Sequence, residues 1–356
     1  MMRKIIKVDT SVPYEVIVGN GVSEGVGEWI KSAMPKVFKV MIVSDETVAA
    51  LYLEKIRSLI TDKGLSVYSF VFPAGEKSKN LSTYSRLIEA LAAAKLTRDD
   101  LVVALGGGVT GDMAGFGAAT YLRGLDFIQI PTSLLAMVDS SVGGKTGVDI
   151  SAGKNLVGAF HQPRRVFCDL DFLKTLPPEW VHDGMGEVLK YAVMGDGHLF
   201  ERLELEESVF PDQEMISRSI ALKRDIVCRD EKESSVRKFL NLGHTFAHAI
   251  EVLSEYKIHH GSAVATGVAM ASDLAFKKGI LSLSDCDRIT RLVSKMGYAV
   301  ITDFPEEDLL KVMLNDKKCS GDSISLVLPK KIGEVVILSE PVKYGIIPKN
   351  NQITRS

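Results

Sequence analysis

The sequence predicts an α/β protein in which a parallel β-sheet flanked by helices precedes a helical second part. Short apolar runs alternate with segments of helical period over the first half of the chain, as in βαβ units. The run at 101–105 is apolar throughout, which is typical of a strand buried on both faces. Helical periodicity prevails after Pro177 and Pro178, so we expect an α/β domain at 1–176 and an all-α domain at 177–356.

The composition is that of an ordinary soluble globular protein. The 356 residues are 46% hydrophobic and 25% charged, and this length favours two domains. A net charge of -2 gives no reason to expect nucleic acid or a membrane surface as a partner. No apolar run approaches the ~20 residues of a membrane span, and the N-terminus has the pattern of a first strand, not of a signal peptide. The 4 cysteines are scattered without a C-x-x-C pair, which favours reduced thiols in a cytoplasmic protein.

Local patterns predict the elements in order. Apolar runs indicate strands at 4–9, 14–18, 39–45, 66–72, 101–105, 127–130 and 166–170. Apolar residues at helical spacing indicate helices at 23–32, 47–63 and 81–95, and small residues at the same spacing indicate another after Gly111. In the second part we expect helices at 179–194, 213–230 and 237–253, and a further helix that 259–261 opens and that runs through 263–278.

A glycine-rich turn joins the strand at 101–105 to the following helix. Gly106, Gly108 and Gly111 fit the pattern G-x-G-x-x-G. A strand, a glycine turn and a helix in this order point backbone N–H groups and a helix N-terminus at a phosphate. A tight turn without a ligand is the alternative.

Polar residues at other strand ends are candidates for the same ligand. Asp45 is placed for ribose hydroxyls, although capping of the next helix explains it equally well. The loop at 73–79 carries Glu76 and Lys79, which could hold ribose and phosphate, but a solvated turn is preferred without further support. The Gly-Gly-Lys-Thr at 143–146 is no Walker A loop, because Asp139 occupies the position of its first glycine. What remains is a turn that presents Lys145, followed by a loop with Lys154 and Asn155, for an anionic group.

The helix expected at 237–253 has an unusual stripe. Arg237, Asn241, His244 and His248 are spaced four, three and four residues apart, so they share one face. A solvent-facing stripe would carry Lys and Glu instead, so we interpret this face as a site wall. Glu187, His244 and His260 make a two-histidine, one-carboxylate set for zinc with an open coordination position, and the choice of histidines stays open. Glu187 and Lys190, three residues apart, share a face of the preceding helix.

Together these motifs resemble the 3-dehydroquinate synthases, a family of sugar phosphate cyclases. The resemblance covers essentially the whole chain and rests on PAGEKSKN at 73–80, GGGVTGDMAGFGAATYLRG at 106–124, QIPTSLLAMVDSSVGGKT at 129–146, GKNLVGAFHQP at 153–163, GMGEVLKY at 184–191, LNLGHTFAHAIE at 240–251, HHG at 259–261 and DKK at 316–318. It implies a Rossmann-like N-terminal domain, shared with glycerol and iron-type alcohol dehydrogenases. Met185, Gly186 and Ala247 depart from residues common in the family without changing a charge.

The resemblance also implies site residues. It places NAD on Asp45, Gly75, Glu76, Lys79, Gly107, Gly108, Val109, Thr110, Gly111, Asp112, Thr132, Ser133, Lys145, Lys154, Phe172, Leu173, Lys174 and Thr175. It places a divalent metal, zinc or cobalt, on Glu187, His244 and His260. The substrate pocket would comprise Arg123, Asp139, Lys145, Asn155, Lys190, Lys223, Arg237, Asn241, His248 and one of Lys317 or Lys318.

The implied activity converts 3-deoxy-D-arabino-heptulosonate 7-phosphate to 3-dehydroquinate and phosphate, in a cleft shared by NAD, the metal and a basic pocket. NAD would be regenerated in each cycle. Members are typically homodimers, and Arg123 is expected to reach the partner's pocket. The role of His259 stays open. The alternatives are a metal- and NAD-dependent alcohol dehydrogenase, a cyclase that makes an inosose or valiolone, and a non-catalytic nucleotide-binding module.

Overall fold

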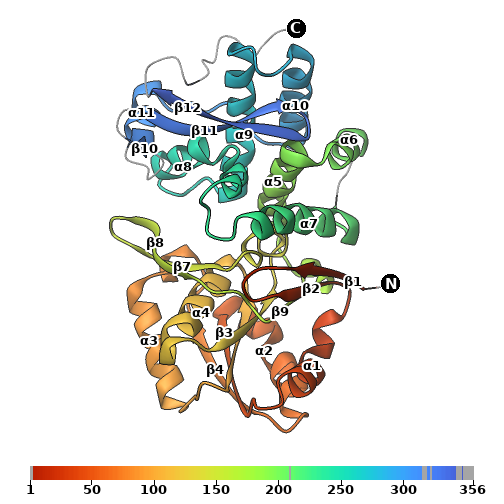
Figure 1. Ribbon diagram of the computed structural model, residues 1–356, viewed down its shortest axis with the longest axis vertical. Helices are drawn as coiled ribbons and strands as arrows, with labels where there is room; N and C mark the ends of the chain where they lie inside the picture. The colour runs from red at the N-terminus through yellow and green to blue at the C-terminus, as the bar shows by residue number, and fades with distance from the viewer. Residues whose placement is uncertain (1–2, 208–209, 315–318, 321–322, 342–346, 348–356) are drawn as a thin grey trace. The chain divides into compact units, whose positions relative to one another are not determined.

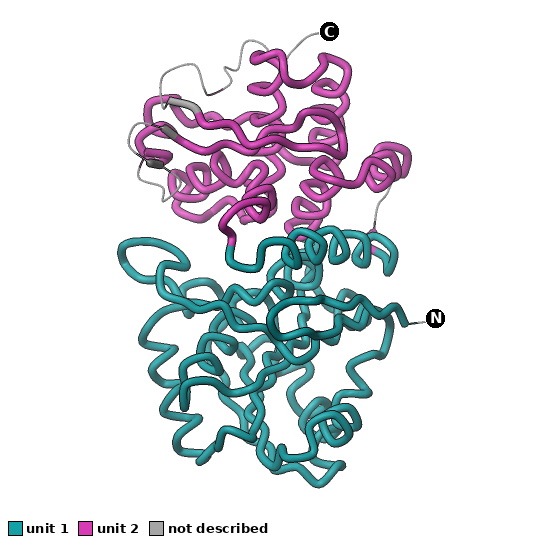
Figure 2. Tube along the Cα trace, in the orientation of Figure 1, with its two compact units in different colours: residues 1–181, 212–232 teal, residues 182–211, 233–356 magenta. Residues whose placement is uncertain are grey.

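The computed structural model describes residues 3–207, 210–314, 319–320, 323–341 and 347, and it divides into two compact units (Figure 1, Figure 2). The first unit comprises Met1–Val181 and Asp212–Lys232, and the second comprises His182–Pro211 and Glu233–Ser356. The chain thus leaves the first unit within helix α5 (Pro178–Gly195) and returns to it for helix α7 (Gln213–Arg229). The sequence pattern had placed the segment of α7 in the second domain.

A seven-stranded sheet forms the centre of the first unit, in the order β1-β2-β9-β6-β5-β3-β4. Its strands are β1 (Lys4–Val8), β2 (Tyr14–Gly19), β3 (Lys39–Asp45), β4 (Ser66–Phe72), β5 (Leu101–Gly106), β6 (Asp126–Pro131) and β9 (Arg165–Asp169). β1 pairs antiparallel with β2, and every other pair is parallel. Each strand expected in this half of the chain is present, and each lies within two residues of its expected bounds.

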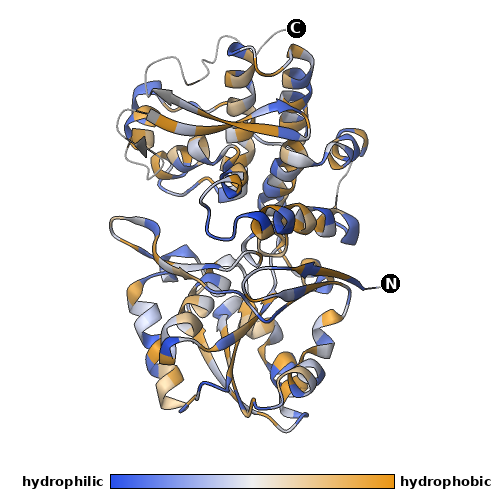
Figure 3. Cartoon of the chain, in the orientation of Figure 1, coloured by the Kyte–Doolittle hydropathy of each residue, from blue (hydrophilic) through white to orange (hydrophobic). Residues whose placement is uncertain are grey.

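Helices cover the sheet because the apolar sides of both must be removed from water. They are α1 (Val26–Ala33), α2 (Glu46–Thr61), α3 (Leu81–Ala93) and α4 (Gly108–Thr120). All residues of β5 are buried, and the orange strands of this unit in Figure 3 show the same apolar centre. The small residues of α4 let it lie close to the sheet, since a Cβ on Gly115 would come within 3.1 Å of the Phe127 ring on β6.

The strand order reverses between β3 and β5, and this point positions the glycine turn. β3 pairs with β4 on one side and with β5 on the other, so the chain continues in opposite directions from there. Ser44 Oγ donates a hydrogen bond to the carbonyl oxygen of Leu105 at 2.8 Å, which ties the two strand ends together. Open parallel sheets bind ligands at such a switch point, beyond the carboxyl ends of the strands.

Two segments that the sequence pattern assigned to loops form a hairpin. β7 (Lys145–Ile150) pairs antiparallel with β8 (Gly153–Phe160), and Lys145 lies opposite Phe160. Gly158 allows the two strands to approach, because a Cβ there would lie 2.1 Å from the carbonyl oxygen of Thr146. Lys145, Lys154 and Asn155 are therefore strand residues of an ordered hairpin.

The second unit is mainly helical, but its predicted all-α character was wrong in one part. The helices are α5, α6 (Gly197–Leu205), α8 (His244–Leu253), α9 (His260–Lys277), α10 (Leu283–Lys295) and α11 (Glu306–Leu314). The unit also contains a three-stranded antiparallel sheet, which consists of β10 (Cys319–Ser320), β11 (Ser323–Lys331) and β12 (Glu334–Pro341). Ile324, Leu326 and Leu328 are buried at a spacing of two, which fits a strand. No helix among the described residues is long and apolar enough to cross a membrane.

The single helix expected at 237–253 is interrupted. A 3₁₀ segment, η6 (Val236–Asn241), ends before Gly243, and α8 begins at His244. Gly243 has φ 77°, a left-handed conformation that an L side chain rarely adopts. A Cβ at this position would also lie 2.8 Å from both the Val264 oxygen and the Val268 nitrogen of α9. Arg237 and Asn241 therefore do not share a helical stripe with His244 and His248.

Gly243→Ala should destabilise the protein more than the matched change Gly279→Ala. Gly279 has a similar φ of 69°, but a Cβ there meets no atom within 4 Å. Both variants incur the left-handed cost of about 1 kcal/mol. Gly243→Ala adds a backbone clash of about 1–3 kcal/mol. Denaturant unfolding of both variants measures the difference, and equal losses would contradict the close contact between Gly243 and α9.

Candidate active site

The glycine turn of the first unit leaves space at the start of α4. Gly107 is the N-cap residue of α4 and has no side chain to satisfy the first N–H groups of the helix. A Cβ on Gly106 would lie 2.4 Å from Thr110 Oγ1, so the turn needs glycine for space. Hydroxyls border the turn, because a Cβ on Gly107 or Gly108 would come within 3.3 Å of Ser133 Oγ or 3.1 Å of Ser140 Oγ. Free helix N–H groups with hydroxyls around them fit the phosphates of a dinucleotide.

Asp45 stands at the end of β3, next to this turn. Its Oδ1 accepts hydrogen bonds from the backbone N–H groups of Thr47 and Val48, both at 3.0 Å, so it caps α2. Its Oδ2 lies 3.5 Å from Thr110 Oγ1 on α4. Asp45 therefore caps α2 with one carboxylate oxygen, and its other oxygen faces the start of α4.

Lys79 brings three separate segments of the first unit together. Its side chain is buried, and its Nζ lies 2.7 Å from Asp112 Oδ2 on α4 and 2.6 Å from Asn155 Oδ1 on β8. Burial lowers the pKa of Lys79, but the charges of Asp112 and Glu76 outweigh it, so the pKa is raised. Burial raises the pKa of Asp112 by more than Lys79 lowers it. The solvated turn preferred for residues 73–79 is thus wrong for Lys79, whose ammonium is an interior charge.

Neighbouring charges extend this cluster. Lys154 Nζ lies 3.8 Å from Glu76 Oε1. Burial raises the pKa of Glu76 despite the lowering effect of Lys79 and Lys154. The Asp149 carboxylate accepts the backbone N–H of Asn155 at 2.7 Å, which holds Asn155 at its left-handed φ of 54°. Asp149 was missed in the sequence, because only the folded hairpin brings it next to Asn155 and opposite Asn80.

A second cation of the first unit is held at the turn after β6. Lys223 on α7 donates to the Asp139 carbonyl oxygen at 2.8 Å, and its Nζ lies 2.9 Å from Asp139 Oδ1. Asp139 belongs to the short helical segment η4 (Ala136–Ser140). Lys223 also lowers the pKa of Asp112, so the predicted substrate and cofactor residues of this unit share one electrostatic environment.

The remaining predicted cofactor residues occupy three places. Thr132 follows β6, and its N–H donates to the Gly106 oxygen at 3.0 Å, which places Thr132 and Ser133 beside the glycine turn. The segment η5 (Leu170–Lys174) is different, because Phe172 and Leu173 are buried and Tyr52 packs edge-on against Phe172. In the same segment, Thr175 Oγ1 is hydrogen-bonded to the Tyr52 hydroxyl, and Lys174 pairs with Asp171 at 2.6 Å. Gly75 lies elsewhere, directly before the 3₁₀ segment η2 (Glu76–Ser78), and has a φ of 99°.

In the second unit, three donors converge from three helices. The ligand atoms of Glu187 on α5, His244 on α8 and His260 on α9 all lie within 4.8 Å of one another. Glu187 Oε1 is 3.2 Å from His260 Nε2 and 3.6 Å from His244 Nε2. The Glu187 side chain is fully buried, whereas His244 and His260 are partly exposed at 21% and 36%. Two imidazoles and a carboxylate with one accessible side match a divalent metal with an open coordination position.

The second nitrogen of each imidazole is also occupied, as metal ligands require. His244 Nδ1 lies 3.1 Å from the Leu242 carbonyl oxygen, so it donates there and leaves Nε2 as the ligand atom. His260 Nδ1 lies 3.4 Å from Glu251 Oε2. Burial lowers the pKa of His260, but hydrogen bonds to Glu187 and Glu251 outweigh it and raise the pKa to about 10. The His260 ring therefore lies between the carboxylates of Glu187 and Glu251, with Nε2 facing Glu187.

Glu251 was missed in the sequence, although a signal existed. It lies seven residues after His244 on α8, two turns along the same face. The polar face of α8 that begins at His244 and His248 therefore continues to Glu251.

Four other predicted site residues belong to the same unit as the three-donor group. Lys190 Nζ lies 2.5 Å from Glu187 Oε2, and both side chains are buried. Arg237 is fully buried on η6, Asn241 donates to Glu233 Oε1 at 3.1 Å, and His248 is on α8 one turn after His244. Lys317 and Lys318 lie outside the described residues. Arg123, in the first unit, is exposed at φ 66° between Leu122 at 50° and Gly124 at 130°.

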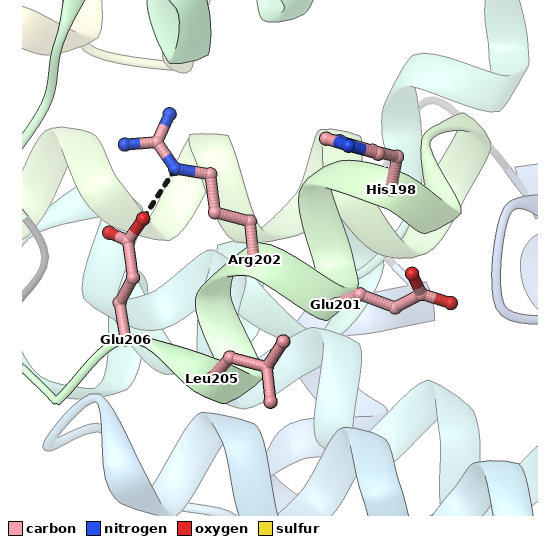
Figure 4. A pocket seen from close by; sticks show the side chains of 5 residues that line it. All are labelled: His198, Glu201, Arg202, Leu205 and Glu206. Carbon is pink, nitrogen blue, oxygen red and sulfur yellow. Dashed lines mark hydrogen bonds and ion pairs between the residues drawn. The ribbon is translucent and has the colours of Figure 1, made fainter.

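A surface pocket on α6 contains none of the predicted residues. His198, Glu201, Arg202, Leu205 and Glu206 line it, and Arg202 Nε bonds Glu206 Oε1 at 2.7 Å (Figure 4). Its side chains come from one helix and the residue after it, and the two that pair with each other are Arg202 and Glu206. We therefore do not assign the reaction to this pocket.

Lys79→Met should cost about 3 kcal/mol of unfolding free energy at pH 8, because it leaves Asp112 charged and unpaired. Asp112 is an acid whose folded pKa is raised, so its ionisation costs stability as the pH rises above about 4. The deficit should therefore shrink at pH 5. The double variant Lys79→Met/Asp112→Asn should recover at least half of it at pH 8. Denaturant unfolding at both pH values tests this, and a deficit that is independent of pH and of Asp112 would refute the ion pair's role.

Comparison with known proteins covers nearly the whole chain. Residues 69–183 match the family described as 3-dehydroquinate synthase N-terminal, and residues 184–319 match the one described as 3-dehydroquinate synthase C-terminal. A 3-dehydroquinate synthase of Streptococcus gordonii is 42% identical over 338 residues, which cover 93% of this chain and 95% of the relative. One of Prochlorococcus marinus is 41% identical over 351 residues, or 95% and 96% of the two chains.

Solved structures with the same fold confirm the expected architecture. A 2-deoxy-scyllo-inosose synthase complexed with carbaglucose-6-phosphate, NAD⁺ and Co²⁺ has a TM-score of 0.85 at 26% identity and covers 96% of this chain and 98% of its own. The 2-epi-5-epi-valiolone synthase of Streptomyces hygroscopicus, with NAD⁺ and Zn²⁺ bound, has a TM-score of 0.85 at 26% identity, with 94% and 95% covered. An iron containing alcohol dehydrogenase, at a TM-score of 0.61 and 16% identity over 87% and 92%, shares the fold alone.

The family matches, the relatives and the two groups of site residues agree. The glycine turn, the Lys79 cluster and the two-histidine, one-carboxylate group all fall in motifs on which the resemblance to the cyclases rested. The chain belongs to the 3-dehydroquinate synthase family.

Proposed function

We propose that the protein is a 3-dehydroquinate synthase, a phosphate-eliminating lyase that converts 3-deoxy-D-arabino-heptulosonate 7-phosphate to 3-dehydroquinate and phosphate. The observation that carries this proposal is the convergence of Glu187, His244 and His260 in a chain 42% identical to named synthases. A phosphate-type glycine turn at the switch point of the same chain supports it. The pathway supplied by this activity is the shikimate route to aromatic amino acids.

We propose NAD and a divalent metal, zinc or cobalt, as its cofactors. Hydroxyls and helix N–H groups around the glycine turn fit the dinucleotide, and Glu187, His244 and His260 fit the cation. When bound, NAD supplies a hydride acceptor that can also return the hydride, and the cation supplies a Lewis acid that lowers the pKa of an alcohol. The predicted NAD shell, from Asp45 and Glu76 to Thr175, stays a proposal, and so does each predicted substrate contact.

The cationic side chains would bind the two anionic groups of the substrate. The Lys223 ammonium lies 2.9 Å from Asp139 Oδ1, and the Lys190 ammonium lies 2.5 Å from Glu187 Oε2. Together with Lys145, Asn155 and Arg237 they would neutralise phosphate and carboxylate and orient the phosphate for departure. His248 would hold the phosphate or relay a proton. Asn241, Arg123 and one of Lys317 or Lys318 complete the proposed set.

We also propose that the protein acts in the cytoplasm as a homodimer in which Arg123 reaches the partner's site. Cys168, Cys228 and Cys286 are free thiols among the described residues, which suits a reducing compartment. The left-handed backbone at Leu122 and Arg123 holds the guanidinium on the surface of its own unit, where a partner could meet it.

The basic residues also separate the synthase from a dehydrogenase of the same fold. A neutral polyol has no group that needs Lys145, Lys223 and Arg237 together. A dehydrogenase would accumulate NADH in proportion to substrate, whereas a synthase returns the hydride in each turnover. The related inosose and valiolone cyclases differ in substrate, so direct competition between substrates distinguishes them.

The purified protein should release phosphate from 3-deoxy-D-arabino-heptulosonate 7-phosphate and form 3-dehydroquinate in equal amounts. NADH should not accumulate, and a chelator should abolish the reaction until zinc or cobalt is restored. Phosphate release and NADH absorbance, followed in one sample, measure both. Steady NADH formation without phosphate release would indicate a dehydrogenase, and unchanged turnover after metal removal would contradict the proposed metal.

A further inference from the structure

The two helices that carry Glu187 and His260 touch through their backbones. A Cβ on Gly186 of α5 would lie 2.0 Å from the Gly261 oxygen, and a Cβ on Gly261 of α9 would lie 1.7 Å from the Asp183 oxygen. Each glycine is the direct neighbour of a metal donor residue. The direct backbone contact between α5 and α9 therefore sets the distance between Glu187 and His260. This distance is fixed only if the two helices cannot slide along each other.

Asp183 makes the hydrogen bonds that hold this register. Its Oδ1 accepts the backbone N–H of Gly261 at 2.7 Å and that of Ser262 at 3.2 Å, so it caps the first turn of α9. His259, the N-cap residue by position, makes no side-chain cap hydrogen bond. By contrast, α2, α3 and α6 are capped by the residue that directly precedes each of them. The cap of α9 comes from another helix.

The position of Asp183 links this cap to both donors. Asp183 lies four residues before Glu187, one turn away on α5, and it is 3% exposed. The N–H group that it fixes belongs to the residue after His260. Its own backbone is fastened nearby, because the Tyr298 hydroxyl donates to the His182 oxygen at 2.5 Å and the two rings stack at 4.2 Å.

We propose that Asp183 is a positioning residue of the metal centre: by capping α9 from α5, it holds His260 at the distance from Glu187 that a cation requires. This inference rests on the proposed metal site of Glu187, His244 and His260. Asp183 lies outside the three-donor group. Outer residues that orient metal ligands typically change metal affinity by 10–100-fold.

Cobalt binding to the metal-free protein tests the proposal. Asp183→Ala should raise the dissociation constant for Co²⁺ by about 10–100-fold and alter the visible cobalt spectrum. Asp183→Asn, which keeps an acceptor oxygen, should stay within about threefold of the parent. The matched control is Asp196→Ala, which removes the Leu199 N–H cap of α6 at 3.0 Å, in the same unit but away from the donors. It should lose a similar amount of stability, about 1 kcal/mol, with unchanged cobalt affinity.

Two results would overturn the proposal. One is parent affinity for Co²⁺ in Asp183→Ala together with a loss of stability like that of Asp196→Ala, since the cap would then be structural only. If Asp183→Ala does not fold, Asp183→Ser takes its place, because a serine oxygen cannot reach both N–H groups from α5. A rise of less than about tenfold in its dissociation constant for Co²⁺ would then contradict the proposal. Failure of the metal site itself looks different, because the parent would then bind no Co²⁺, or His244→Ala would bind it as tightly as the parent.

Discussion

A fully buried carboxylate is the constraint on which the second unit depends. Glu187 has no exposed surface, and an ion in such a place is costly unless charges of the opposite sign surround it. The Lys190 ammonium at 2.5 Å supplies one such charge, and the His260 imidazole lies 3.2 Å away. A divalent cation held by Glu187, His244 and His260 would satisfy the same carboxylate. The polar interior of this unit is therefore poised for a cation, and the close contact of α5 with α9 keeps the donors together.

The first unit solves a different problem with a different device. It must present backbone N–H groups to an anion, which an extended strand end alone cannot do. The reversal of strand order beside β3 opens a place for them, and the glycines after β5 keep it free of side chains. Lys79 then joins the loop before α3, the helix α4 and the hairpin β7–β8 through one ammonium group. The cost of burying that charge is offset by Asp112, so the site and the packing of three segments rest on the same ion pair.

The sequence predicts most of this fold because its signals are local. The uniformly apolar strand at 101–105, the glycine turn and the period of the helices each follow from neighbouring residues. Signals fail where a distant contact decides the conformation. Gly243 interrupts the helix expected at 237–253, because the backbone of α9 lies so close that no side chain fits at this position. The residues around Gly243 carry no sequence signal of this contact. The hairpin β7–β8 and the sheet β10–β12 depend on pairing between strands, and α7 returns to the first unit through tertiary packing. Asp183 contacts the start of α9, which is remote in sequence, so only the folded chain reveals it.

X-ray absorption at the cobalt edge of the Co²⁺-loaded protein tests the three-donor centre most directly. A site made by Glu187, His244 and His260 should give a first shell of nitrogen and oxygen with the outer-shell pattern of two imidazoles, and His244→Ala should lose one of them. A shell that contains sulfur, or a spectrum that His244→Ala leaves unchanged, would contradict the assignment of the metal to these residues.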